Sequence, residues 1–384
     1  MARSIAQGHG FSSPFYPSTG PTAIVPPLFT YLLAAVFRTF GLYTAASAVV
    51  ILSINSVLSA LTCVPLYFST RYALGQRAAM LTAWGWALYP FAIYFSATRV
   101  WEYALTGFLF TTCFCLAQRL HRRRRNLGWI GFGILYGITG LSNPSVLPMF
   151  PVFLILTAIV LHRRKEKWLV HSLIAAISLL VVLAPWTIRN YRAVHLIAPV
   201  RDNFWLEFWP GNNGNTFESN DHTDRPPTEA VELQKFVALG ETAYLAQNRV
   251  LAMSFVRQHP FLFIKFTLHR VLSYWTGYWS FNPAYLRDQP TELPNMFFTV
   301  GLTFFMLLGA RSLWRRDKTT ALPYLLLLAI FPIAYYLTHV IPDYRQPIEP
   351  EIIALVSAGV LSVKRFNRPL PQPEPELVAL ELPA

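Results

Sequence analysis

The sequence predicts an all-α polytopic membrane protein, and three observations support this fold class. Hydrophobic residues make up 54% of the 384 positions, and charged residues only 13%, whereas soluble globular chains average about 25% charged residues. Long apolar stretches recur along most of the chain. The connectors between them are alternately basic and nearly uncharged, which is the pattern that orients membrane spans. Orientation therefore accounts for the net charge of +13, and nucleic acid is not expected as a partner.

The apolar stretches indicate about nine transmembrane helices, several of them shorter than the ~20 residues that a bilayer requires. Residues 22–40 resemble a tenth span, but Pro26 and Pro27 suit a helix start and Arg38 interrupts the far end. We expect an interfacial or re-entrant helix there. The nine expected spans are approximately 46–68, 78–95, 102–119, 127–141, 145–161, 168–186, 294–313, 319–338 and 348–363.

The basic connectors predict the topology. Placing alternate connectors on one side collects more than half of the 32 Lys and Arg residues, and such connectors belong in the cytoplasm. The other side then receives residues 1–44 and 187–293, so any chemistry on that face is extracytoplasmic. We expect a multi-pass protein of the plasma (inner) membrane. The cytoplasmic connectors centre on residues 71–77, 119–125, 163–167, 311–318 and 364–368.

The chain divides into five segments by composition. The long segment 187–293 mixes polar turn signals with interspersed Trp, Phe and Leu, so it reads as a small ordered region. Prolines dominate the end of the chain and predict disorder. The predicted segments are 1–44, extracytoplasmic with the interfacial helix; 45–186, a transmembrane bundle; 187–293, an extracytoplasmic region; 294–368, C-terminal transmembrane helices; and 369–384, a disordered cytoplasmic tail.

Glu102 is the candidate functional residue. Only Glu102 and Glu166 carry carboxylates in the first 201 residues, and Glu166 is embedded in a basic run. Glu102 is the first residue of an apolar stretch. A carboxylate at a membrane boundary costs enough free energy to suggest that it has a function. The structural alternatives are a helix N-terminal carboxylate, worth about 0.3–1 kcal/mol, and an ion pair with Arg99. No metal site is predicted, because Cys113 and Cys115 are two apart on a helix and face different ways.

Four segments in this order resemble integral membrane glycosyltransferases of the GT-C superfamily, closest in pattern to the bacterial protein O-mannosyltransferase and aminoarabinose-transferase group. The resemblance covers nearly the whole chain, although each motif alone is weak. The segments are Ala2–Phe11, Thr19–Leu28, Ala184–Tyr191 and Asp343–Pro350.

The resemblance implies a helical bundle that transfers a sugar on the extracytoplasmic face. The donor would be a sugar linked to polyprenyl phosphate, with membrane lipid around it. The acceptor would be a glycan, a lipid or a protein. No cofactor is certain, and a divalent cation stays open. Inversion at the anomeric carbon needs a general base for the acceptor and cations on the leaving phosphate.

Site residues follow from the same resemblance. Glu102 matches an acidic position at the outer start of a span, with general base, metal contact or acceptor orientation as its role. Tyr344 and Arg345 match a Tyr-Arg pair before the last span, where a guanidinium can clamp phosphate oxygens; an ion pair with Asp343 or Glu349 is the alternative. The remaining candidates for donor or phosphate binding are Arg189, alternatively an interfacial anchor, and Arg3 and His9 of the outer N-terminal segment.

The chain departs from the family pattern in two places. Relatives place Lys or His before the Pro-Pro pair, and here Val25 occupies that position. Relatives also begin with a membrane span and an acidic outer loop before the segment that starts here at Ala2. We therefore expect an N-terminally incomplete or inactive form of a longer enzyme. Two other classes stay open: a non-catalytic membrane subunit or scaffold, and a transporter or flippase.

Overall fold

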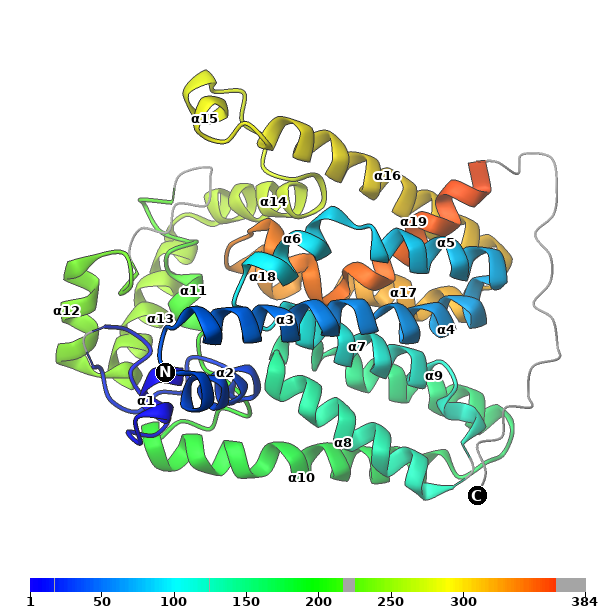
Figure 1. The fold of residues 1–384 in the computed structure, drawn as a ribbon, viewed down its shortest axis with the longest axis horizontal. Helices are drawn as coiled ribbons and strands as arrows, with labels where there is room; N and C mark the ends of the chain where they lie inside the picture. The colour runs from blue at the N-terminus through cyan, green and yellow to red at the C-terminus, as the bar shows by residue number, and fades with distance from the viewer. Residues whose placement is uncertain (17, 124, 217–224, 364–384) are drawn as a thin grey trace.

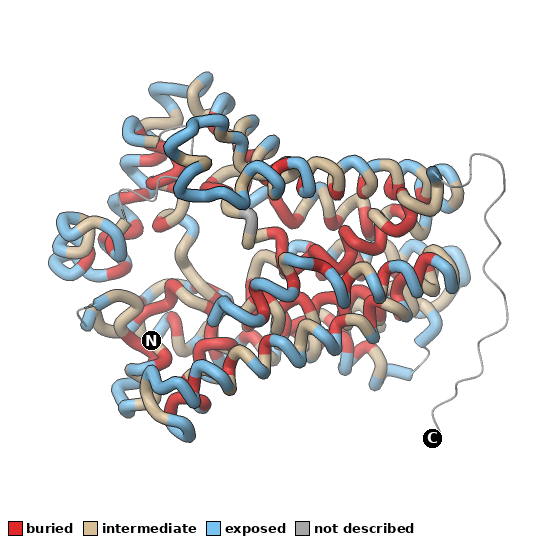
Figure 2. Tube along the Cα trace, turned by 45° about the horizontal axis from the view of Figure 1, so that its top comes forward, coloured by how far each residue is buried: buried red, intermediate tan, exposed pale blue. Residues whose placement is uncertain are grey.

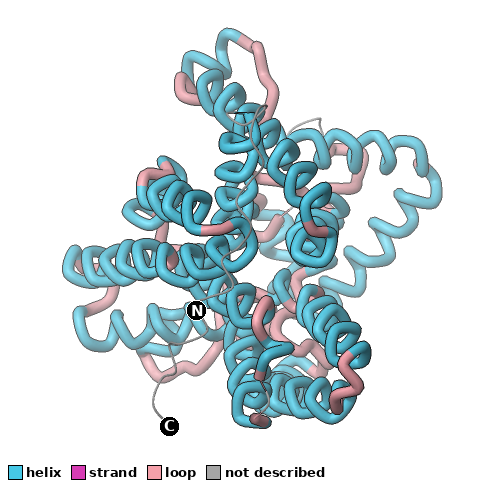
Figure 3. The backbone as a smooth tube through the Cα atoms, turned by 90° about the vertical axis from the view of Figure 1, so that its right-hand side faces the viewer, coloured by secondary structure: helices cyan, strands magenta, loops and turns pink. Residues whose placement is uncertain are grey.

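The computed structural model describes residues 1–16, 18–123, 125–216 and 225–363, and its regular structure is helical apart from one isolated bridge between Ser12 and Pro21. Loops of varied length join the helices (Figure 3). The helices are α1 (Ala2–Ala6), α2 (Pro27–Phe40), α3 (Ala45–Leu61), α4 (Cys63–Leu74), α5 (Gln76–Ala87), α6 (Pro90–Thr98), α7 (Tyr103–Ala117), α8 (Asn126–Ser142), α9 (Met149–Arg163), α10 (Trp168–Val194), α11 (Phe204–Phe208), α12 (Ala230–Leu239), α13 (Glu241–Gln258), α14 (Pro260–Thr276), α15 (Pro283–Asp288), α16 (Glu292–Arg316), α17 (Lys318–Ile330), α18 (Ile333–Leu337) and α19 (Glu349–Val363), with 3-10 segments η1 (Leu120–Arg122), η2 (Pro144–Val146) and η3 (Pro342–Ile348).

Six helical segments of the described residues are long and apolar enough to cross a membrane. They agree with six of the expected spans, but the count of nine is not confirmed. The expected spans 78–95, 102–119 and 127–141 are shorter helices instead. The predicted tail 369–384 lies outside the described residues. The six segments are Ala45–Leu74, Pro144–Arg163, Trp168–Val194, Glu292–Arg316, Lys318–Leu337 and Asp343–Val363.

Proline explains why the expected span 78–95 is interrupted. Pro90 follows Tyr89, whose backbone is extended at φ −68° and ψ 114°. A residue before proline is disfavoured in the helical region, so α5 ends at Ala87 and α6 begins anew at Pro90. Pro27 acts in the same way at the start of α2, where the sequence predicted a helix start.

Helix α19 is the central helix of the bundle, and α10 is a peripheral one. In α19, 72% of the apolar window is buried, against 17% in α10. Figure 2 shows buried residues on the inward-facing sides of the bundle. Exposed apolar side chains cover the outer face of α10, including Leu173, Ile177 and Val181. Such a face is suited to lipid.

Close packing of α16 against α19 depends on glycine. A Cβ atom on Gly309 would collide with the Leu355 carbonyl oxygen, and one on Gly359 would collide with that of Phe305. Small residues of this kind let two membrane helices approach backbone to backbone.

Residues from the predicted outer segments 1–44 and 187–293 meet at one end of the bundle. Helices α1, α2, α12 and α13 lie there, away from the α4–α5 junction (Figure 1). The Ala23 amide donates to Glu241 Oε1 at 2.7 Å, and the Asp202 amide donates to the Ala23 carbonyl at 2.9 Å. Arg189 donates to the carbonyl oxygens of Thr22 and Phe11, each at 2.5 Å. The side of the membrane that this end faces stays a prediction, as do the segment boundaries.

Candidate active site

Glu102 precedes the first helical residue of α7, and its side chain makes no capping hydrogen bond to the helix. The carboxylate is half-buried and accepts a hydrogen bond from Asn143 Nδ2 at 3.4 Å. Asn143 is fixed in turn, because its Oδ1 accepts from the Ser145 amide at 3.0 Å. Glu102 lies at the N-terminus of α7, so the helix-dipole alternative fits its position even though no capping hydrogen bond is made.

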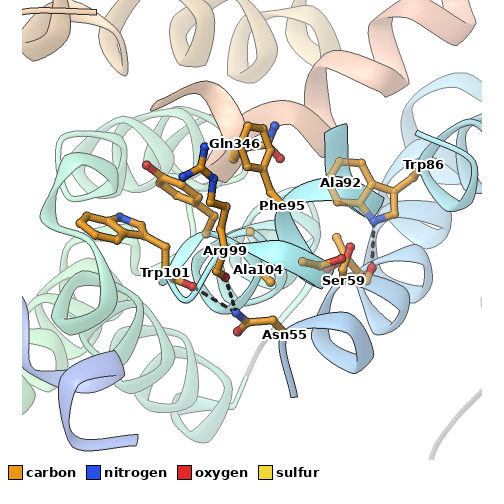
Figure 4. Close-up of a pocket in the computed structure, with 13 residues that line it drawn as sticks. Asn55, Ser59, Trp86, Ala92, Phe95, Arg99, Trp101, Ala104 and Gln346 are labelled. Atoms are coloured by element: carbon orange, nitrogen blue, oxygen red, sulfur yellow. Dashed lines mark hydrogen bonds between the residues drawn. The ribbon is translucent and has the colours of Figure 1, made fainter. Parts of the chain in front are cut away.

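The connector in front of Glu102 is held by a polar residue of α3. Asn55 Nδ2 donates to the Arg99 carbonyl at 3.1 Å and to the Trp101 carbonyl at 3.4 Å (Figure 4). These residues border a cavity of about 20 Å³, which also contacts Tyr103. A cavity of that size holds about one water molecule and no sugar. The hydrogen bonds from Asn55 therefore position the connector in front of Glu102.

The electrostatic environment of Glu102 favours proton exchange near neutral pH. Burial raises the pKa of Glu102 from an ordinary 4.5 to about 7, and the nearby Arg201 guanidinium opposes that rise. Arg99, the partner considered from sequence, lies within electrostatic reach of Asp343. A carboxyl group with a pKa near the working pH can act as a general base or acid.

Tyrosines from three separate elements gather beside Glu102. Tyr335 of α18 donates to Ser145 Oγ at 3.0 Å, and its ring stacks on that of Tyr344 with centroids 4.7 Å apart. Tyr103 lies within electrostatic reach of Glu102, Tyr335 and Tyr344. The predicted residues Glu102 and Tyr344 are thus brought to the same cluster.

Tyr344 also connects the cluster to the segment after α10. Its hydroxyl lies 2.6 Å from His339 Nε2, and His339 Nδ1 lies 3.7 Å from Glu207 of α11. Glu207 forms an ion pair with Arg225. Arg201, Glu207 and Tyr335 were not predicted, since residue type alone did not distinguish them from other polar residues of their segments.

Arg345 is buried and faces away from solvent. Its Nε forms an ion pair with Glu349, and its Nη1 donates to the Tyr274 carbonyl at 3.4 Å. Glu349 Oε2 also accepts from the Tyr89 hydroxyl at 3.1 Å. The ion-pair alternative stated for Arg345 is therefore present, and its contact with a donor stays a prediction.

The other three predicted residues lie in the N-terminal segment or bind it. The Arg189 guanidinium donates to N-terminal carbonyls and stacks on the rings of Phe11 and Trp186, with distances of 5.0 Å to each centroid. Arg3 is exposed and donates to Gln7, the residue after its own helix, at 3.2 Å, and His9 is exposed. Donor contact by these residues stays a prediction.

The part of the chain that the structure describes contains no preformed metal-binding cluster. No group of three or more His, Cys, Asp and Glu side chains there could hold an ion. Glu102 and Asp343 lie in the same neighbourhood of Tyr103.

Solved structures share this helical arrangement. The Archaeoglobus fulgidus oligosaccharyltransferase in its apo form matches with a TM-score of 0.55 at 16% identity, covering 94% of this chain and 45% of that one. The archaeal oligosaccharyltransferase AglB from the same organism, in complex with an inhibitory peptide and a dolichol-phosphate, matches with a TM-score of 0.54 at 16% identity and the same coverage. This chain spans less than half the length of these structures.

A weaker match is to ArnT from Cupriavidus metallidurans bound to undecaprenyl phosphate, with a TM-score of 0.40 at 13% identity, covering 94% of this chain and 71% of that one. No curated protein matches the chain.

The fold is thus similar to that of a solved membrane oligosaccharyltransferase. Residues 24–188 match the model of the dolichyl-phosphate-mannose-protein mannosyltransferase family. The matched range extends from the start of α2 to the last turns of α10 and includes Glu102.

Proposed function

We propose that this protein transfers a sugar from a polyprenyl-phosphate donor to an acceptor hydroxyl beside Glu102. We call the residues gathered there the Glu102 cluster: Glu102, Tyr103, Arg201, Glu207, Tyr335 and Tyr344. The observation that carries the proposal is Glu102 itself, a half-buried carboxyl group with a pKa of about 7 beside Arg201. The family match over residues 24–188 supports glycosyl transfer. The likeness to a structure that contains a dolichol-phosphate supports a polyprenyl-phosphate donor.

Glu102 acts as the general base in this proposal. The acceptor oxygen attacks the anomeric carbon while the carboxylate takes the hydroxyl proton. The bond between that carbon and the phosphate oxygen breaks, and its electron pair leaves with the phosphate. Arg201, within electrostatic reach of Glu102, Tyr335 and Tyr344, offsets the charge that develops there.

We propose that the reaction takes place on the extracytoplasmic face, and the topology predicted from the basic connectors supports this. The Glu102 cluster includes Arg201 and Glu207 from the segment 187–293, which the alternation of connectors predicts to be extracytoplasmic. The plasma (inner) membrane is the proposed location. A long lipid donor explains why the reacting groups lie at the end of a membrane bundle.

Substitution of Glu102 by Gln tests the function, because it keeps the shape and removes proton acceptance. Membranes containing the protein are supplied with a radiolabelled mannosyl polyprenyl phosphate, and transfer to endogenous acceptors is measured. Glu102→Gln should lower turnover by about 100-fold or more, since general base catalysis contributes that much. Glu166→Gln is the matched control at the only other early carboxylate. Equal activity of the two variants would indicate that the role of Glu102 is structural.

A further inference from the structure

A groove lies between the end of α7 and the start of α8, at the opposite end of α8 from Asn143. It has a volume of about 620 Å³ and is open to the outside. Figure 1 shows α8 beginning away from the end that contains α1 and α2. We call it the arginine groove. Its arginines are Arg122, Arg123 and Arg125, and its apolar wall includes Leu116, Leu127 and Phe132.

The polar half of the arginine groove is suited to an anion. None of its lining residues carries a carboxylate. The first turn of α8 has no acidic residue and no side-chain cap, and the positive end of a helix dipole favours an anion nearby. The loop is positioned by Trp129, whose Nε1 donates to the Arg123 carbonyl at 3.0 Å. The stem of Arg123 packs on Gly128, where a Cβ would approach it to 3.3 Å.

The apolar half of the groove distinguishes a lipid from a free phosphate. Leu127 is 75% exposed although it opens an apolar helix, and Phe132 and Leu120 form the buried floor. A small anion would leave the apolar side chains of the groove exposed to water. An acyl chain would cover it while its headgroup phosphate reached the guanidinium groups, as basic pockets between membrane helices do with anionic lipids.

We propose that the arginine groove binds one anionic phospholipid from the leaflet at that end of the bundle. The headgroup phosphate lies among Arg122, Arg123 and Arg125, and one acyl chain runs along Leu116, Leu127 and Phe132. This site is separate from the Glu102 cluster and does not depend on the proposed transfer reaction.

Lipid retention measures this binding directly. The purified protein is equilibrated with vesicles of phosphatidylglycerol or phosphatidylcholine, and bound lipid is counted by native mass spectrometry. The wild type should keep one phosphatidylglycerol and lose phosphatidylcholine. The variant R122Q/R123Q/R125Q should bind phosphatidylglycerol at least about tenfold more weakly, because each basic residue near an anionic headgroup contributes attraction. R311Q/R315Q/R316Q removes the same charge from another basic connector and should bind as the wild type does.

A second variant separates lipid from phosphate and guards against misfolding. Leu127→Gln keeps all three arginines, adds no charge and replaces only an exposed apolar side chain by a polar one. It should weaken phosphatidylglycerol binding, while inorganic phosphate at the same concentration should fail to displace the lipid from the wild type. Equal loss in both triple variants, no preference for the anionic lipid, or full retention by Leu127→Gln would each overturn the proposal.

Discussion

Protonation of Glu102 should control the pH dependence of transfer. Its pKa is raised to about 7, so the carboxyl group is mostly protonated below that pH and cannot accept a proton. Turnover should rise about tenfold per pH unit below pH 7 and level off above it, as expected for one essential base. Initial rates between pH 5.5 and 8.5 measure the profile.

Arg201 supplies the internal control for this profile. Because its positive charge lowers the pKa of Glu102, Arg201→Gln should move the midpoint to higher pH. Arg99→Gln should leave the midpoint in place, since Arg99 is placed toward Asp343. A flat profile, or equal midpoints in both variants, would argue against Glu102 as the titrating base.

The Arg345–Glu349 pair should matter for stability as a unit. Both side chains are buried, and removing one partner of a buried ion pair costs about 3–5 kcal/mol, whereas replacing both is often near neutral. Arg345→Met should therefore lower the thermal unfolding temperature of the purified protein. The double variant R345M/E349M should recover most of that loss. A double variant as unstable as the single one would show that the charge left behind is not the cause.

The close packing of α16 against α19 predicts that a side chain added at Gly309 lowers the stability of the protein. Gly309→Ala would place a Cβ against the Leu355 carbonyl, so the two helices must separate. Overpacking of this kind typically costs about 1–3 kcal/mol. Gly301→Ala in the same helix meets nothing within 4 Å and should be neutral or slightly stabilising. Thermal unfolding in detergent compares the two, and equal unfolding temperatures would contradict the close approach.

The sequence was informative where local chemistry decides an element, and less so where distant segments meet. Pro27 begins α2 as expected, and six apolar spans were found. Pro90 interrupts residues 78–95, which hydrophobicity alone predicted to be one continuous span. Glu102 was singled out because carboxylates are rare near it. Its contacts with Asn143 and Arg201 depend on how the bundle closes, and periodicity and composition carry no information about that.

The topology of the whole molecule can be tested with single cysteines. Cys63, Cys113 and Cys115 are first replaced by Ala. Ala246→Cys on α13 and Thr319→Cys on α17 then introduce exposed thiols at residues that the basic connectors predict on opposite sides. Intact cells treated with an impermeant thiol reagent should label position 246 and not position 319. Labelling of position 319 in intact cells would invert the topology.

The contacts that fix the N-terminal segment set an order of assembly. Thr22 is bound by a residue 167 positions later, and Ala23 by one 218 positions later. At a synthesis rate of about 5–20 residues per second, the ribosome needs roughly 10–45 s to supply the second partner. During that interval the backbone groups of Thr22 and Ala23 lack Arg189 and Glu241. The last of these contacts can form only after α13 has been synthesised, so the folding of the N-terminal segment is completed late.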